Sequence, residues 1–369
     1  MSKADEVYRW LLEQFASGAI AEGERLPSEP ELARRFSSSR PPVRQALARL
    51  VHEGLVETRQ GKGSFRISSQ RGAAAAQSDI AVLLPFLSGY IYPELVEAAG
   101  VAIRERGYHA LFACSEGSPA IEADILQRLL ERAPQGIIIS PVCPTPAEPV
   151  PNLHLLQKIR AAGIPILVLD HELEGFSSLF LDDYGAGQEA ARYLFERRMR
   201  RAAVVWKEGH RPFYYRKQGF IDEWNRLVDA GSSSPVAEEL LLPPGPESAW
   251  TEPIRAFLES KLRGQHLPLA FFCANDTMAL AVRTAALGLG IKIPQDISLI
   301  GFDDSPLARI SEISLTSFRY PSRQLGAKAV ELIFDHIAEQ PYSSRIKLTI
   351  SPLIIERSSV LSLPKEEPL

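Results

Sequence analysis

Several polar side chains stand where the carboxyl ends of predicted strands would meet. Asp170, Asn275-Asp276 and Asp303-Asp304 each follow directly after a six-residue, mostly apolar run. Ligands of parallel α/β sheets bind beyond the carboxyl ends of the strands, so we expect these side chains to converge. Carboxylate and amide oxygens bind hydroxyl pairs well. The pattern therefore favours a site for a polyhydroxylated small molecule.

Arginine and aromatic side chains accompany these groups. Arg216 opens a predicted helix just after the cluster Phe213-Tyr214-Tyr215. A guanidinium donates hydrogen bonds to hydroxyl groups, and an aromatic face covers the apolar side of a sugar ring. The sequence contains no Walker A motif, no Gly-x-Ser-x-Gly motif and no histidine pair at zinc-protease spacing. We therefore expect a binding site without catalytic residues, cofactor or metal.

A different chemistry is indicated near the N-terminus. Residues 1–71 carry 12 Lys and Arg against 9 Asp and Glu, whereas residues 72–369 carry 29 against 36. The DNA-facing candidates are Arg40, Arg44 and Gln45 on one predicted helix and Gln60, Gly61 and Lys62 in a turn. Arginines near a helix N-terminus can reach base edges or phosphates, and a lysine in a turn can contact a phosphate. We expect this small basic head to bind double-stranded DNA.

Short helices and one hairpin must position the DNA-facing groups. The apolar spacing predicts helices over 4–17, from Ser28 through Phe36 and between Ser39 and Gly54, and strands over 55–59 and 64–67. Ser28 and Glu31 have the spacing of a capping box. The third helix has one apolar face made of Val43, Ala46, Leu47, Leu50 and Val51. Two helices joined by a short turn and followed by a basic hairpin predict a winged helix-turn-helix.

The rest of the chain alternates apolar strands with helical stretches. The predicted strands are 80–85, 110–114, 136–140, 164–170, 179–182, 202–206, 269–274 and 297–302. Near-continuous apolar strands between helices indicate parallel sheets covered on both faces. About 290 residues exceed one comfortable core, so we expect two α/β lobes with a cleft between them.

The domain organisation follows from these patterns. We predict a DNA-binding domain over 1–69, a linker over 70–78, a two-lobed domain over 79–360 and a tail over 361–369. The longest apolar runs are far shorter than the roughly 18 residues of a membrane span, and no secretory signal is visible. Three widely spaced cysteines indicate buried thiols in a reducing compartment. We therefore expect a cytoplasmic protein.

The basic head resembles the DNA-binding domain of the GntR family. The resemblance rests on the stretches Leu26–Ala33, Ser39–Leu47, Glu53–Val56 and Arg59–Phe65. It implies that Arg40 and Arg44 contact DNA from the recognition helix and that Gln60 and Gly61 form a wing tip in the minor groove. The sequence departs from the family pattern at Pro30, where an arginine is usual, and at Pro41-Pro42, where small or hydroxyl residues are usual.

Residues 79–360 resemble the effector domain of the LacI/GalR family, which is itself similar to periplasmic sugar-binding proteins. The resemblance rests on the stretches Ile164–Asp170, Asp182–Gly187, Arg216–Phe220, Phe272–Ala279, Ile293–Ser298, Gly301–Asp304 and Leu315–Ser317. It implies that Asp170, Arg216, Asn275 and Asp303 bind the ligand. It also implies a ligand-stacking Trp250, an aromatic contact from Tyr92 and a contact from Tyr320 near the lobe crossover.

The two resemblances together imply a homodimeric repressor of carbohydrate-utilisation genes. Two heads would bind a roughly palindromic operator, and a sugar or sugar derivative bound between the lobes would release it. Two other readings stay open at this point. One is a carbohydrate-binding protein without a DNA role, and the other is a sugar-metabolising α/β enzyme.

Overall fold

The computed structural model describes residues 3–21, 23–52, 55–59, 63–66, 78–143, 149–229, 236–264, 268–310, 314–339 and 344–361. The chain divides into two compact units, Met1–Asp79 and Ile80–Leu369. The predicted wing tip at 60–62, the predicted linker residues 70–77 and residues 362–369 of the predicted tail lie outside the described residues.

The first unit is a winged helix-turn-helix. It contains α1 (Lys3–Ala16), α2 (Glu29–Arg35), α3 (Arg40–His52) and the antiparallel strands β1 (Val56–Arg59) and β2 (Gly63–Arg66). Its core comprises Val7, Leu11, Leu32, Val43 and Leu50, each fully buried. The predicted capping box is present, because the Ser28 backbone N–H donates to Glu31 Oε2 at 2.7 Å. Val51, predicted on the apolar face of α3, is 40% exposed instead.

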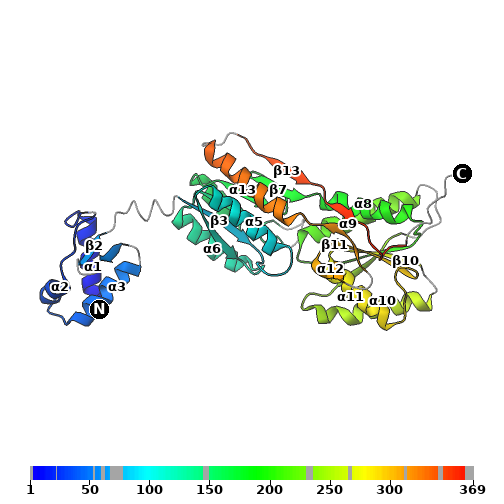
Figure 1. The fold of residues 1–369 in the computed structure, drawn as a ribbon, viewed down its shortest axis with the longest axis horizontal. Helices are drawn as coiled ribbons and strands as arrows, with labels where there is room; N and C mark the ends of the chain where they lie inside the picture. Colours follow the sequence, from blue (N-terminus) through cyan, green and yellow to red (C-terminus); the bar gives the residue numbers. More distant parts are fainter. Residues whose placement is uncertain are drawn as a thin grey trace. The chain divides into compact units, whose positions relative to one another are not determined.

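The second unit has two α/β lobes (Figure 1). The first lobe contains β3 (Asp79–Leu84), α5 (Tyr92–Glu105), β4 (His109–Cys114), α6 (Pro119–Arg132), β5 (Gly136–Ile139), α7 (Leu153–Ala161), β6 (Ile166–Leu169), β7 (Ser177–Leu181), α13 (Ser322–Ala338) and β13 (Lys347–Ile350). The second lobe contains α8 (Asp183–Glu196), β8 (Ala202–Lys207), α9 (Arg211–Asp229), β9 (Glu238–Leu242), the 3-10 helix η1 (Glu247–Trp250), α10 (Thr251–Arg263), β10 (Leu269–Cys273), α11 (Asp276–Gly288), β11 (Ile297–Asp303), α12 (Pro306–Ile310), β12 (Thr316–Arg319) and β14 (Leu353–Ile355).

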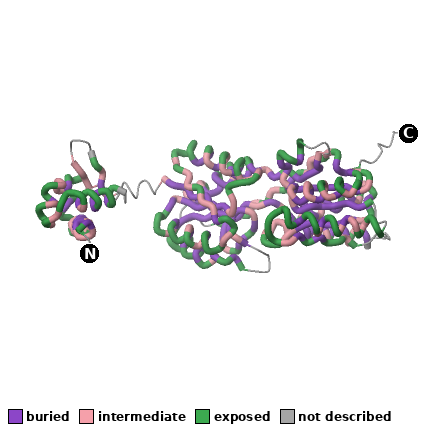
Figure 2. The backbone as a smooth tube through the Cα atoms, turned by 90° about the horizontal axis from the view of Figure 1, so that it is seen from below, coloured by how far each residue is buried: buried purple, intermediate pink, exposed green. Residues whose placement is uncertain are grey.

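Each lobe is built on a six-stranded sheet. The strand orders are β13-β7-β6-β5-β3-β4 and β14-β12-β11-β10-β8-β9. Strands β3, β5, β6, β7 and β13 run parallel to one another, as do β9, β8, β10, β11 and β12, while β14 joins antiparallel. The central strands are buried along their whole length, as Figure 2 shows, because helices cover both faces. The parallel arrangement predicted from the apolar runs is confirmed.

The chain crosses between the lobes more than once. It leaves the first lobe after β7, returns with α13 and β13, and ends its described strands with β14 in the second lobe. Strands β9, β12, β13 and β14 were absent from the sequence prediction. Strands β13 and β14 lie at sheet edges and are partly exposed, so they lack the continuous apolar signal of a central strand.

The structure also shows the state of the three cysteines and the length and polarity of the helices. Cys143 and Cys273 are buried and Cys114 is partly buried, and all three are free thiols. Within the described ranges, each helix is too short or too polar to traverse a lipid bilayer.

Candidate functional site

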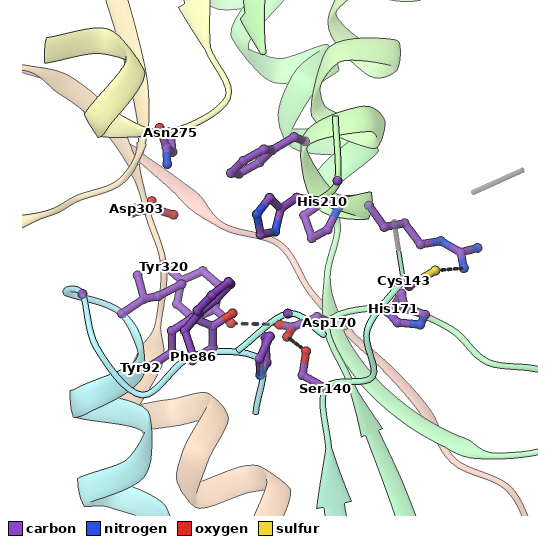
Figure 3. A pocket seen from close by; sticks show the side chains of 18 of the residues that line it. Phe86, Tyr92, Ser140, Cys143, Asp170, His171, His210, Asn275, Asp303 and Tyr320 are labelled. Carbon is purple, nitrogen blue, oxygen red and sulfur yellow. Dashed lines mark hydrogen bonds between the residues drawn. The ribbon is translucent and has the colours of Figure 1, made fainter. Parts of the chain in front are cut away.

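A cavity of about 360 Å³ lies between the two lobes (Figure 3). Its walls come from the loops that follow β3, β5 and β6 in the first lobe and β8, β10 and β11 in the second lobe. The cavity therefore lies beyond the carboxyl ends of parallel strands, where such folds bind ligands. Six of the seven residues predicted from the sequence line it: Tyr92, Asp170, Arg216, Asn275, Asp303 and Tyr320.

Asp303 ends β11 in a strained conformation. Its φ of 110° is unusual for a residue with a side chain, and such strain is common at functional sites. Its Oδ2 accepts a hydrogen bond from the Tyr90 hydroxyl at 3.1 Å, and its Oδ1 lies 3.9 Å from Arg216 Nη1. Burial raises the pKa of Asp303 to about 8, against the lowering effect of Arg216. At neutral pH the carboxyl is therefore mostly protonated and can donate a hydrogen bond as well as accept one.

Arg216 is held rigidly at the start of the second turn of α9. Its Nε donates to Asp183 Oδ1 at 2.7 Å, its Nη1 donates to the Ala274 carbonyl at 2.7 Å, and its guanidinium lies 3.3 Å from the Phe302 ring centroid. Burial raises the pKa of Asp183 to about 6, and the Arg216 charge opposes this rise. At neutral pH Asp183 is therefore mostly ionised and balances the charge of Arg216.

The backbone around Arg216 depends on a glycine. A Cβ at Gly187 would lie 2.1 Å from the Arg216 carbonyl oxygen and 2.7 Å from the Phe220 nitrogen. Gly187 therefore lets α8 approach α9 closely at the turn that carries Arg216.

The carboxylate oxygens of Asp170 already accept hydrogen bonds from other side chains of the protein. Its Oδ1 accepts a hydrogen bond from the Tyr320 hydroxyl at 3.1 Å, and its Oδ2 accepts one from Ser140 Oγ. Burial raises its pKa, while these two hydrogen bonds lower it. Figure 3 shows these two hydrogen bonds close to the side chains of Tyr92 and Phe86. Asp170 thus fixes the position of Tyr320.

Asn275 has two roles in the structure. It is the N-cap of α11, because its Oδ1 accepts a hydrogen bond from the Met278 backbone N–H at 3.0 Å. It also lines the cavity. Since the oxygen serves the helix, the amide NH2 group is the part of Asn275 left to donate to a ligand.

Trp250, the seventh predicted residue, does not line the cavity. It is 3% exposed, it packs in the core of the second lobe, and its Nε1 donates to the Pro243 carbonyl at 3.2 Å. Trp250 belongs to the same buried cluster as Ile254 and Leu258, and Lys207 Nζ lies 5.5 Å from its ring centroid. The structure thus places Trp250 outside the cavity lining, away from the ligand-stacking position that the sequence predicted.

Several further residues line the cavity that the sequence did not predict: Phe86, Tyr90, Ser140, His171, Lys207, His210 and Arg211. Most of them follow strands that were predicted, so the strand-end rule would have found them if applied to every strand. The His210 ring lies 6.2 Å from Phe86 and 5.0 Å from Phe213, measured between ring centroids. Burial lowers the pKa of both His171 and His210 to about 4, so both imidazoles are neutral at pH 7.

The predicted DNA-facing residues lie on the outer face of α3. Arg40, Arg44 and Gln45 are exposed, while Val43 and Ala46 turn inward to the core of the head. Arg44 Nε donates to Glu29 Oε2 at 2.9 Å, which links the recognition helix to the start of α2. Gln60, Gly61 and Lys62 lie outside the described residues, between the ends of β1 and β2.

Comparison with known proteins supports both domains. Residues 3–65 match the family of bacterial regulatory proteins called gntR, and residues 191–360 match a periplasmic binding protein-like domain. The arabinose metabolism transcriptional repressor of Geobacillus stearothermophilus is 29% identical over 96% of this chain and 95% of its own. The repressor of the same name from Halalkalibacterium halodurans is 27% identical over 90% of each chain.

Solved structures share the fold of the second unit. A periplasmic binding protein/LacI transcriptional regulator from Alkaliphilus metalliredigens, complexed with D-xylulofuranose, has a TM-score of 0.63 and 19% identity, over 78% of this chain and all of its own. The complex of the transcriptional regulator CelR with cellobiose has a TM-score of 0.63 and 20% identity, over 90% of this chain and all of its own.

Proposed function

Since the chain joins a gntR-family DNA-binding domain to a periplasmic-binding-protein-like domain, we propose that it represses sugar-utilisation genes and releases its operator when a sugar binds between the lobes. Its domains and its relatives are those of a DNA-binding transcription regulator, not of an enzyme. Its relatives are named as repressors of arabinose metabolism, which supports carbohydrate as the class of effector.

The observation that carries this proposal is the convergence of Asp303, Arg216 and Asn275 on one cavity. In the bound state Arg216 and the Asn275 amide donate hydrogen bonds to sugar hydroxyls. Asp303 accepts a hydrogen bond from a sugar hydroxyl when it is ionised, and it can also donate one when it is protonated. Phe86 and Tyr92 cover the apolar face of the sugar.

The release of DNA follows from the position of the cavity. Its walls belong to both lobes, so a ligand that contacts both walls stabilises a closed arrangement. The ligand shifts the equilibrium only as far as its affinities for the open and closed states differ. We propose that the protein acts as a homodimer in the cytoplasm, with two heads on a roughly palindromic operator, and that closure changes the spacing of the heads.

The winged head distinguishes this function from the two other readings. A carbohydrate-binding protein without a DNA role leaves the exposed pair Arg40 and Arg44 on α3 without a purpose. A sugar-metabolising enzyme would convert the sugar that it binds. A gel shift at several salt concentrations tests DNA binding directly, since phosphate contacts impose a steep salt dependence. Chromatography of the recovered sugar tests for turnover.

The decisive experiment measures operator release. An operator is selected from random DNA, and its complex is titrated with mono- and disaccharides and with their acid and phosphate forms. One of these compounds should dissociate the complex. Asn275→Ser keeps a good helix cap but removes the amide donor, so it should need about tenfold more of that compound.

The control is Ser118→Asn, which exchanges the N-cap of α6 outside the cavity lining. It should respond to the sugar as the wild type does. If saturating ligand leaves operator affinity unchanged or raises it, the release model is wrong.

A further inference from the structure

Two cationic side chains of the cavity lining have no carboxylate partner among the described residues. Arg211 donates to Cys143 Sγ at 3.5 Å and to the Tyr215 hydroxyl at 3.2 Å, neither of them a carboxylate, and its buried Nε has no hydrogen-bond partner in the described part of the chain. Lys207 Nζ lies 5.5 Å from the Trp250 ring centroid. Among the described residues, no carboxylate lies within ion-pair distance of either cation. The negative charge of Glu247 lies beyond that distance, and it opposes the lowering of the Lys207 pKa by burial.

The carboxylates of the cavity lining offset these two charges only in part. Asp170 and Asp303 are the acidic residues of the lining. Asp170 is hydrogen-bonded to the Tyr320 and Ser140 hydroxyls, and Asp303 contacts Tyr90 and Arg216, so neither carboxyl is paired with Lys207 or Arg211 in the described part of the chain. The charge of Arg216 is already balanced by Asp183 at 2.7 Å. The side of the cavity near α9 therefore carries a net positive charge.

The surroundings of these cations favour a negative group further. Lys207 and Arg211 flank the N-terminus of α9, a helix of 19 residues whose dipole stabilises anions at that end. His171 is only 5% exposed and lines the cavity, and its Nε2 has no hydrogen-bond partner. A buried nitrogen of this kind is costly to leave unsatisfied, so a ligand oxygen that contacts it gains affinity.

We propose that the effector is an anionic sugar derivative whose carboxylate or phosphate lies between Lys207 and Arg211 while its hydroxyls contact Arg216, Asn275 and Asp303. This proposal rests on the proposed function and specifies its ligand class. The cavity volume of about 360 Å³ is that of a small-molecule site, and it suits a single sugar unit with one charged substituent.

The test compares matched pairs of compounds by calorimetry. Each neutral sugar is paired with its own acid or phosphate: arabinose with arabinonate, glucose with gluconate, galactose with galacturonate, and ribose with ribose 5-phosphate. We expect the charged member of at least one pair to bind about tenfold or more tightly than its parent. Comparison of the acid pairs with the phosphate pair shows which anionic group the site takes.

Variants that remove a positive charge test which side chains cause the preference for the charged compound. Lys207→Met and Arg211→Gln should each reduce the affinity ratio within the preferred pair severalfold. Lys158→Met, which removes an exposed cation of α7 outside the cavity, should leave the ratio unchanged. The ratio is insensitive to a general loss of folded protein, because both members of a pair are measured on the same sample.

The outcomes separate this proposal from the function on which it rests. If a neutral sugar binds as tightly as its charged partner and dissociates the operator, the repressor function stands and the anionic effector is rejected. If the preference survives in both Lys207→Met and Arg211→Gln, the assigned anion site is rejected. If no member of any pair binds while another neutral sugar dissociates the operator, the anionic effector is rejected and the repressor function stands.

Discussion

The Tyr90 hydroxyl donates a hydrogen bond to Asp303 Oδ2 at 3.1 Å, across the cleft between the lobes. Tyr90 belongs to the loop between β3 and α5 of the first lobe, whereas Asp303 ends β11 of the second. The same hydroxyl lies 3.1 Å from Thr277 Oγ1. The protein thus places one of its own hydroxyl groups on the carboxyl group that we assign to the sugar. A ligand hydroxyl therefore competes with Tyr90 for Asp303 Oδ2.

Removal of this internal competitor should strengthen ligand binding. Tyr90→Phe keeps the ring but loses one hydrogen bond of about 1 kcal/mol, so the ligand Kd should fall about fivefold. Tyr108→Phe is the matched control. It removes the hydroxyl of a tyrosine that packs on Phe334, and it should not change Kd. Calorimetry with the operator-releasing compound measures both. A weaker or unchanged Kd in Tyr90→Phe would show that the hydroxyl does not compete with the ligand.

The protonation of Asp303 predicts a specific pH dependence of stability. Its folded pKa of about 8 lies above its ordinary value of 3.8, so the folded state holds the proton more tightly than the unfolded chain does. The stability contributed by this group is fully present below about pH 4 and is lost as the pH rises through 8. Asp303→Asn imitates the protonated form and lacks this loss.

Denaturant unfolding between pH 5 and pH 9 measures the difference. The free energy of unfolding of Asp303→Asn, relative to wild type, should rise by more than about 1 kcal/mol over this range. Asp124→Asn, at an exposed carboxylate of α6, should show no comparable trend. Parallel pH profiles of Asp303→Asn and wild type would contradict a protonated Asp303.

The close packing of α8 on α9 predicts that Gly187 is intolerant of a side chain. Gly187→Ala places a Cβ against the backbone of Arg216 and Phe220, which should cost about 1–3 kcal/mol of stability and weaken ligand binding. Gly288→Ala is the matched change in α11, where a Cβ meets no atom within 4 Å. It should be neutral or stabilise slightly. Equal melting temperatures for the two variants would show that α8 can move away without loss.

The exposed position of Arg44 on α3 predicts how substitutions of Arg44 and of its partner Glu29 change the affinity for operator DNA. Arg44→Ala should weaken operator affinity by about 1–3 kcal/mol and reduce the preference for operator over random DNA. Glu29→Gln removes the carboxylate that pairs with Arg44 at 2.9 Å and should strengthen DNA binding. Arg128→Ala, at an exposed arginine of α6, is the control and should have no effect. Gel shifts at fixed salt test all three, and wild-type affinity in Arg44→Ala would remove this residue from the DNA interface.

The sequence by itself determined the two kinds of domain and six of the residues that line the cavity. The capping box at Ser28 and the inward face of α3 are short-range patterns, and they held because the head packs each helix on its own apolar stripe. The strand-end positions of Asp170, Asn275 and Asp303 placed them together, because parallel strands carry their carboxyl ends to one edge. These features depend on residues near in sequence or on the general geometry of a parallel sheet.

The tertiary structure alone decided how the cavity groups are paired and charged. Trp250 lies in the core of the second lobe, and Tyr90 reaches Asp303 from the opposite lobe. Within the described ranges, Lys207 and Arg211 have no carboxylate at ion-pair distance. The raised pKa of Asp303 likewise depends on its burial between the lobes. Contacts of this kind join residues far apart in the chain. Their pairing and burial follow from how the two sheets meet, which no local pattern of residues encodes.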